Sequence, residues 1–397
     1  MRVLSVVGAR PQFIKMAPLA RAFERHNALG REPVESIIVH TGQHYDTEMS
    51  DVFFDELELP PAAFNMGVGS GSHGRQTAHM LEKLEPVLLQ TRPDMVLIYG
   101  DTNSSVAGAL AAAKLHMPVA HVEAGVRSFN RRMPEEINRV VADHVSDLLL
   151  APTRAAMENL EREGLSRRAV LTGDVMYDAV AAHRQVAARR SSILGTLGLA
   201  PGTYALATVH RAENTDDAER LEGIVTALND IAGDGLPLVL PLHPRTAQAV
   251  RSTLPRWSPS PSLHVIAPVG YLDMLCLVGH ARLVLTDSGG LQKEAFFLGC
   301  PCVTLREETE WTETVAAAGN ILAGAAPAAI RAAVRTWEHR RAGGVPDFAA
   351  AASTSFGDGR AADRIVQALV AASHGAAHVG PAADETAAIN TTEGAQC

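Results

Sequence analysis

The sequence predicts an α/β protein of two doubly wound domains, whose parallel sheets face a central cleft. The chain has 397 residues, and at about 150 residues per domain this length corresponds to two or three domains. Hydrophobic residues make up 47% and charged residues 20%, which is typical of globular proteins and excludes wholesale disorder. Short apolar runs alternate with helical patterns along both halves of the chain, as expected for parallel sheets covered by helices on both faces.

The first half of the chain shows this alternation most clearly. Apolar, β-branched runs predict strands at 3–7, 36–40, 95–99, 119–123 and 147–151. Helical patterns fall between them at 13–26, 77–90, 103–115 and 135–145. We expect these elements to form a first domain over residues 1–175.

The second half repeats the pattern. Strands are predicted at 204–209, 238–242, 283–286 and 302–305, with helices at 221–232, 246–254 and 291–298. The second domain is therefore expected over 176–359. A helix at 360–372 is expected to pack on a domain surface and to rejoin the first domain. Residues 373–397 are rich in Ala, Gly and Thr without apolar periodicity, which predicts a disordered tail.

Charge and composition exclude several functional classes. The 35 basic and 44 acidic residues give a net charge of -9, so no nucleic-acid partner is expected. No apolar run approaches the roughly 18–20 residues that span a bilayer, so no membrane partner is expected. The four cysteines form no CxxC pair, which argues against a zinc ribbon or a disulfide framework. The first residues form a buried strand without a secretory signature, and a cytoplasmic location is the expectation.

Polar side chains follow six of the predicted strands. Ligands of open α/β sheets bind beyond the carboxyl ends of the strands, so these residues are candidates for a site. The segments after the strands are Arg10 with Lys15, Gly100-Asp101-Thr102, Glu123 to Arg127, His210 to Asn214, His243-Pro244-Arg245 and Asp287 to Gly290. Six such endings on one side of the molecule indicate a functional cleft.

One of these segments is suited to phosphate. Ser288, Gly289 and Gly290 stand directly before a predicted helix, and exposed amides at a helix N-terminus bind anions. Arg10 and Lys15 belong to the other domain. A diphosphate held between the two domains would use both sets.

Other motifs give weaker signals. Residues 69–74 match GxGxxG, but the preceding 63–68 is a poor strand, and a mobile loop is favoured over a dinucleotide site. No P-loop occurs. The pair His40 and His44 and the pair Cys300 and Cys302 are better explained as structural residues. We therefore expect neither a cofactor nor a metal.

Carboxylates are the strongest catalytic candidates. Asp101 and Glu123 end neighbouring strands, and Glu135 and Glu136 follow Pro134 at a helix start. The helix dipole alone favours a carboxylate at this place, so one of Glu135 and Glu136 needs no functional explanation. Acidic groups around one cleft can serve as acid, base and cation stabiliser when their surroundings separate their pKa values.

Eight segments together resemble the non-hydrolysing UDP-N-acetylglucosamine 2-epimerases. They match in order between residue 2 and about residue 372. The segments are Gly8 to Lys15, Thr41 to His44, Gly100 to Thr102, His121 to Gly125, Pro134 to Arg139, Gly173 to Val175, Thr208 to Asn214 and Thr286 to Glu294.

The resemblance implies a glycosyltransferase-B-like fold with two Rossmann-like domains and a UDP-sugar in the cleft. It implies interconversion of UDP-GlcNAc and UDP-ManNAc at C2, without NAD or metal, by loss and re-addition of UDP through a 2-acetamidoglucal. The implied catalytic residues are Asp101, Glu123, Glu135 and His210. The implied substrate-binding residues are Arg10, Lys15, Arg127, His210, Ser288, Gly289, Gly290 and Glu294, the last near the ribose. Relatives are commonly homodimers, so a homodimer is expected.

Two departures from the family pattern stand out. Trp311 stands where the resemblance predicts an arginine near the sugar nucleotide. Either Arg306 or Arg245 supplies the missing positive charge, or the protein accepts a different sugar. Many bacterial members bind a second UDP-GlcNAc as an activator. The matching positions are Gln43, His44, Arg75, Gln76, Arg211 and His243. Asp46 replaces a glutamine there and places a carboxylate near an anionic ligand, which argues against activation.

Four alternatives remain open at this point. They are an epimerase for a modified UDP-HexNAc, a hydrolysing 2-epimerase, a glycosyltransferase of the same fold and a nucleotide-sugar sensor without turnover. Such glycosyltransferases often carry a second Glu eight residues after the first in the nucleotide site. Here Cys302 occupies that place after Glu294. The set Asp101, Glu123 and Glu135 argues against a sensor, because binding alone needs no carboxylates around C2.

Overall fold

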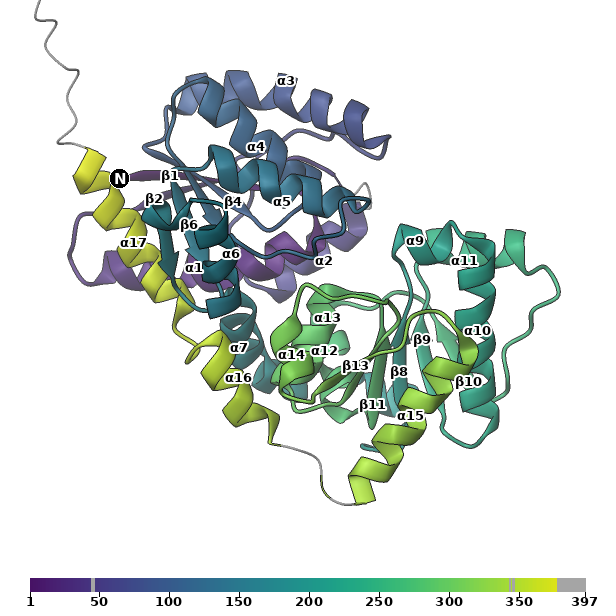
Figure 1. Cartoon of the computed structure of the whole chain (residues 1–397). Coiled ribbons are helices and arrows are strands. Elements are labelled where there is room, and N and C mark those ends of the chain that lie inside the picture. Colours follow the sequence, from purple (N-terminus) through teal and green to yellow (C-terminus); the bar gives the residue numbers. More distant parts are fainter. Residues whose placement is uncertain (44–46, 343, 345–346, 377–397) are drawn as a thin grey trace, which may run out of the picture.

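The computed structural model describes residues 1–43, 47–342, 344 and 347–376. Two α/β domains lie side by side, and the carboxyl-terminal helices run back along the first of them (Figure 1). The domains contain sheets of seven and six strands, and every strand pair is parallel. This arrangement confirms the predicted fold class.

The first sheet has the order β3-β2-β1-β4-β5-β6-β7. Its strands are β1 (Arg2–Val7), β2 (Glu35–His40), β3 (Phe64–Asn65), β4 (Met95–Tyr99), β5 (Val119–Val122), β6 (Leu148–Ala151) and β7 (Ala169–Leu171). The helices between them are α1 (Arg10–Ala28), α2 (Thr47–Glu56), α3 (His73–Thr91), α4 (Asn103–Lys114), α5 (Pro134–Val145) and α6 (Arg154–Arg162), followed by the 3-10 turn η1 (Ser166–Arg168). The central strand β4 is buried over its whole length, as a strand covered on both faces must be.

The second sheet has the order β10-β9-β8-β11-β12-β13. Its strands are β8 (Ala205–Thr208), β9 (Leu238–Pro241), β10 (Leu263–Ile266), β11 (Leu283–Thr286), β12 (Cys302–Thr304) and β13 (Asn320–Leu322). The helices around it are α8 (Ile193–Thr196), α9 (Ala212–Thr215), α10 (Ala218–Gly233), α11 (Pro244–Thr253), α12 (Tyr271–His280), α13 (Gly289–Phe297), α14 (Thr312–Ala316) and α15 (Pro327–Ala342). In both sheets the chain order reverses beside the first strand, which is where such folds bind ligands.

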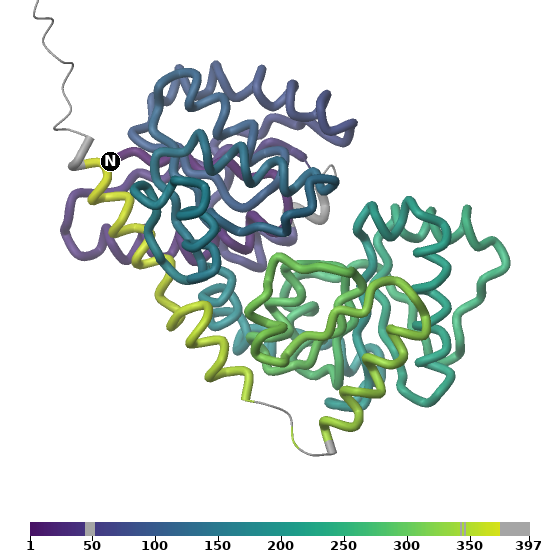
Figure 2. The backbone as a smooth tube through the Cα atoms, in the orientation of Figure 1, coloured from purple at the N-terminus to yellow at the C-terminus, as the bar shows by residue number. Residues whose placement is uncertain are grey.

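The chain crosses between the domains twice at nearly the same place. Helix α7 (Val175–Arg190) leads out of the first domain, and α16 (Phe348–Phe356) and α17 (Ala361–Ala376) lead back. The Asp178 carboxylate accepts bonds from the amides of Ala361 and Ala362 at 3.2 and 2.8 Å. The trace of α17 then follows the first domain (Figure 2). The helix predicted over 360–372 thus packs on the first domain and continues to Ala376. The domain limits themselves stay a prediction.

Several element boundaries differ from the sequence prediction. Helix α1 starts at Arg10 rather than 13, because Pro11 stands in the first turn, where no backbone bond is lost. Helix α3 starts at His73, inside the glycine-rich segment 69–74. The edge strands β3, β7, β10 and β13 were not predicted. They are short and partly exposed, so they lack the continuous apolar run of a central strand.

No helix in the described part of the chain combines the length and apolar character that crossing a membrane requires.

Gly125→Ala is expected to destabilise the fold more than the matched change Gly164→Ala. Both glycines have positive φ, at 79° and 74°. A Cβ on Gly125 would lie 2.4 Å from the carbonyl oxygen of Ala156, whereas at Gly164 nothing lies within 4 Å. The backbone strain costs about 1 kcal/mol at either position, and the clash adds roughly 1–3 kcal/mol at Gly125. Denaturant unfolding measures both, and equal losses would contradict the clash.

Candidate active site

Side chains from both domains meet where the carboxyl ends of the two sheets approach each other. Several polar contacts join the two domains here, and three of them are given as examples. Arg211 donates to Glu135 at 2.5 Å, Lys293 to Glu123 at 2.8 Å and Asn130 to Glu308 at 2.8 Å. The predicted cleft is therefore lined by the segments that follow the strands of both sheets.

Asp101 is held by an arginine from a neighbouring helix. It stands between β4 and the N-cap Thr102 of α4. The Arg139 side chain in α5 donates to its Oδ2 from Nε at 3.0 Å and from Nη2 at 2.6 Å. Burial would lower the pKa of Arg139, but the carboxylates of Asp101, Glu310 and Glu136 raise it. The other oxygen, Oδ1, has no hydrogen-bond partner in the described part of the chain.

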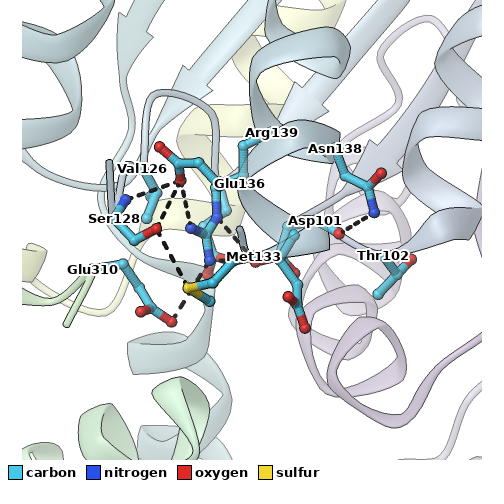
Figure 3. Close-up of polar contacts among 12 residues, drawn as sticks. Asp101, Thr102, Val126, Ser128, Met133, Glu136, Asn138, Arg139 and Glu310 are labelled. Atoms are coloured by element: carbon cyan, nitrogen blue, oxygen red, sulfur yellow. Dashed lines mark hydrogen bonds and ion pairs between the residues drawn. The ribbon is translucent and has the colours of Figure 1, made fainter. Parts of the chain in front are cut away.

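The two glutamates at the start of α5 have different roles. Glu136 is buried and accepts bonds from the backbone amides of Ser128 and Phe129, both at 2.9 Å (Figure 3). It fixes the loop before the helix. Glu135 is partly exposed and pairs with Arg211 of the second domain, so it is the glutamate of the pair that lies in the cleft.

Glu123 lies between two lysines. Lys15 Nζ is 2.5 Å from its Oε1, and Lys293 Nζ is 2.8 Å from its Oε2. Burial by itself would raise the pKa of Glu123, but the two ammonium groups outweigh it and bring the pKa to about 2. The residue also has a left-handed backbone, with φ at 72°. Glu123 is thus an ionised carboxylate in a backbone conformation that its surroundings must hold.

His210 follows β8 and is oriented by Asp287. Its Nδ1 is 3.1 Å from Asp287 Oδ1, and the same carboxylate accepts the amides of His210 and Arg211 at 3.0 and 2.9 Å. Burial would raise the pKa of Asp287, but His210 and the backbone bonds lower it to about 2. The His210 Nε2 has no hydrogen-bond partner among the described residues, so it is available to a ligand.

The predicted phosphate segment begins α13. Ser288 is the N-cap and accepts the Leu291 amide at 3.4 Å. Gly289 and Gly290 are the first two helical residues, whose amides have no acceptor inside the helix. A Cβ on Gly289 would lie 2.2 Å from Glu310 Oε1, so only glycine fits there.

Arg10 comes to the same cleft from the first domain. Its guanidinium lies over the Phe53 ring at 4.9 Å, and within the described ranges it has no ion-pair partner. Burial lowers the pKa of Arg10, although Glu294 and Glu56 oppose this. Arg10 is therefore a buried cation without an ion-pair partner among the described residues, and it lies within the electrostatic reach of Glu294 in α13.

Glu294 is buried near Arg10. Burial raises its pKa to about 7, although Arg10 and Lys293 oppose the shift. A carboxyl group with this pKa is destabilising when ionised. Ligand hydroxyls would supply hydrogen bonds that its side chain does not receive from the described residues.

Arg127 does not join the other predicted substrate-binding residues. It is buried and paired with Asp143 at 2.7 Å, and it reaches Glu163 through Nε and Nη2 at 2.8 and 2.7 Å. Asp143 also accepts from His121 at 2.6 Å. This geometry favours a structural role for Arg127 in the turn after β5, and a role in substrate binding stays a prediction without support here.

Two of the candidate second-ligand residues contact each other, since Gln76 donates to the Gln43 carbonyl at 3.2 Å. Gln43 accepts the Ser104 amide at 3.0 Å, and Gln76 donates to the Gly69 carbonyl at 2.7 Å, both in the first domain. Arg75 is exposed on α3, Arg211 pairs with Glu135, and His243 caps α11. His44 and Asp46 lie outside the described residues, so the argument from Asp46 is untested.

Five buried charged residues received no individual role in the sequence analysis, although four of them lie in segments named there. They are Lys293, Asp174, Arg139, Asp287 and Glu310. Glu310 is one example, because burial would raise its pKa but Arg139, Arg306 and Arg211 lower it to about 2. No sequence pattern around these five residues identifies the side chain with which each forms an ion pair.

Trp311 has a different environment from the one expected. It is buried, and its ring lies 3.6 Å from Lys293 Nζ. The two proposed substitute cations are already paired, Arg306 with Glu310 and Arg245 with Asp216, both at 3.0 Å. Lys293 is thus the cation beside Trp311.

No group of three or more His, Cys, Asp or Glu side chains that could hold a metal ion occurs among the described residues.

Comparison with known proteins shows a close relationship over most of the chain. A family model described as UDP-N-acetylglucosamine 2-epimerase matches residues 27–370. A Pseudomonas aeruginosa protein named UDP-2,3-diacetamido-2,3-dideoxy-D-glucuronate 2-epimerase is 50% identical over 339 residues, covering 85% of this chain and 92% of that one. A Methanocaldococcus jannaschii UDP-N-acetylglucosamine 2-epimerase is 40% identical over 375 residues, covering 93% and 99%.

Solved structures give the same relationship. The crystal structure of the M. jannaschii UDP-GlcNAc 2-epimerase with UDP-GlcNAc and UDP has a TM-score of 0.85 and covers 94% of this chain and all of that one, at 40% identity. The Neisseria meningitidis enzyme bound to UDP-GlcNAc has a TM-score of 0.81 at 30% identity, covering 94% of this chain and 100% of that one.

Glu294→Gln is expected to stabilise the free protein at high pH. The Glu294 pKa is raised from 4.5 to about 7, so the protonated form favours folding. That contribution is complete below about pH 4.5 and is lost as the pH rises through 7, by roughly 3 kcal/mol. The variant should therefore melt above wild type at pH 8, and the gap should close towards pH 5. A gap that is independent of pH would contradict this assignment.

Proposed function

The chain belongs to the UDP-N-acetylglucosamine 2-epimerase family, and on this premise we propose that it inverts C2 of a UDP-linked 2-acetamido sugar by eliminating UDP and adding it back. UDP-GlcNAc and UDP-ManNAc are the proposed pair. The proposal rests above all on one observation. Three carboxylates lie at the junction of the domains near α13, together with Arg10, which has no ion-pair partner among the described residues.

A chain of contacts supports this grouping. Asp101 pairs with Arg139, whose Nη2 is 3.6 Å from Glu310 Oε1, and Glu310 packs directly against Gly289. Glu123 reaches α13 through Lys293. The groups suited to sugar chemistry and those suited to phosphate therefore occupy adjoining parts of one site.

The chemistry explains why both sets are needed. The C2 hydrogen of a pyranose has no neighbouring carbonyl to acidify it, so departure of UDP must lead and the ring must become oxocarbenium-like. Carboxylates stabilise such a transition state. The leaving diphosphate needs fixed donors, and Arg10 with the amides of Gly289 and Gly290 is suited to hold it.

The three carboxylates differ in their capacity to move a proton. Glu123 is ionised and held by two lysines, so its suited role is to stabilise positive charge. Asp101 keeps Oδ1 free of partners in the described part of the chain, and Glu135 is partly exposed. We therefore assign proton transfer at C2 to Asp101 or Glu135, with Lys15 and His210 completing the polar lining.

A modified UDP-HexNAc is a second candidate substrate. One relative at 50% identity is named for a diacetamido glucuronate, and another at 50% identity is named a UDP-N-acetylglucosamine 2-epimerase homolog, so identity alone does not separate the two sugars. A homodimer and a role in polysaccharide biosynthesis stay predictions.

The decisive test is exchange at C2 across a panel of UDP-HexNAc sugars. Wild-type protein in D2O, with one sugar nucleotide and no acceptor, is expected to give deuterium at C2 and the 2-epimer, both measured by NMR. Release of free sugar and UDP would identify a hydrolysing enzyme, and turnover only with an acceptor would identify a glycosyltransferase. No exchange with any member of the panel would exclude the proposal.

Asp101→Asn is expected to lower turnover by about 100-fold or more while UDP affinity changes little, because the amide cannot accept a proton. Steady-state kinetics and calorimetric UDP titration separate the two effects. Asp234→Asn, at an exposed position outside the cleft, is the matched control and should behave as wild type. Equal loss of turnover and UDP binding would make Asp101 a nucleotide-binding or structural residue.

A further inference from the structure

Four charged side chains form a linear chain of ion pairs at the junction of the domains. Lys15 bonds Glu123, Glu123 bonds Lys293, and Lys293 bonds Asp174, at 2.5, 2.8 and 2.6 Å. Their exposed fractions are 7%, 8%, 1% and 1% for Lys15, Glu123, Lys293 and Asp174. Two positive and two negative charges balance in a region from which water is largely excluded.

Lys293 is the member that joins the two domains. It belongs to α13, whereas Lys15 belongs to α1 and Glu123 follows β5. Asp174 is the N-cap of α7, where the chain leaves the first domain, and its other oxygen accepts the Met176 amide at 2.7 Å. One ammonium group therefore connects the proposed catalytic carboxylate, the crossing helix and the second domain.

Trp311 covers the same ammonium. Its ring lies 3.6 Å from Lys293 Nζ and packs towards Phe356 with ring centroids 6.2 Å apart. A cation over an indole face is attracted to it, more strongly when water is excluded. An arginine at position 311 would instead place a second positive charge next to Lys293.

We propose that Lys293, covered by Trp311, is a positioning residue for the proposed epimerisation, because it holds the Glu123 carboxylate ionised and oriented when the two domains are together. The inference rests on the proposed function, since it assigns how one of the carboxylates of that site is prepared. It also gives Trp311 a role that does not require contact with the sugar.

The charges around Glu123 determine how its pKa changes when Lys293 is removed. Lys15 and Lys293 face it directly, Asp174 lies behind Lys293, and Glu294 acts on Lys293 from within α13. Without Lys293, the ammonium group of Lys15 alone would balance the buried carboxylates of Glu123 and Asp174. The pKa of Glu123 must then rise from about 2. A protonated Glu123 cannot stabilise a cationic ring, so activity on the acid side would disappear at a higher pH.

The test compares Lys293→Met with wild type by kcat, KM and the pH dependence of kcat. We expect kcat to fall about 100-fold, as for misplacement of a catalytic group, while KM changes by less than about threefold and the acid limb moves up by about one pH unit or more. Lys293→Arg keeps the charge and should recover part of kcat and the original acid limb. Lys114→Met, at an exposed position at the end of α4, is the matched control.

A charge-balanced variant covers the case in which Lys293→Met does not fold. Asp174→Asn with Lys293→Met removes one charge of each sign, and asparagine remains a good N-cap for α7. This double variant should be folded by circular dichroism, bind UDP and still show the low kcat. Wild-type kcat and acid limb in folded Lys293→Met, or in the folded double variant, would overturn the inference. Wild-type inactivity with every UDP-HexNAc would instead reject the proposed function.

Discussion

The ion pair between Lys293 and Glu123 is the contact on which the site depends. It brings a cation from the second domain to a carboxylate of the first, beside the helix that joins them. Buried ion pairs of this kind contribute little net stability, because desolvation offsets the attraction, but loss of one partner leaves a charge stranded. The network therefore acts less as a source of stability than as a constraint on how the two domains meet.

This constraint accounts for the division of charges in the cleft. The chain is acidic overall, with a net charge of -9, so it cannot attract a diphosphate by its total field. The first domain instead supplies Arg10, which has no ion-pair partner among the described residues, and the second supplies the N-terminus of α13. Lys15, Lys293 and Arg139 are each paired with carboxylates. Arg10 is thus suited to bind an anionic ligand, whereas Lys15, Lys293 and Arg139 determine the charge state of the acids.

The sequence predicted the parallel sheets, the cleft and the residues that end the strands, because these follow from hydrophobic periodicity and from where chains turn. It did not predict the partners. Lys293 lies 170 residues from Glu123, and in the sequence it is an ordinary helical lysine after Gln292. Nor did it predict that Arg127, which stands in a strand-end segment, pairs with Asp143; its role in substrate binding stays a prediction. Spacing reports which residues share an edge of a sheet, whereas side-chain direction depends on packing between elements distant in the chain.

Trp311, at a position where the family resemblance predicts an arginine, illustrates why a single substitution does not identify the substrate. A tryptophan at the cleft would be taken as a change in the sugar pocket. Here its ring is buried against Lys293 and Phe356, and a guanidinium in its place would repel that ammonium. An aromatic ring at position 311 therefore attracts the Lys293 ammonium, whereas an arginine there would repel it. The two positions act as a unit that prepares Glu123, and the identity of the sugar must be determined by groups that touch it.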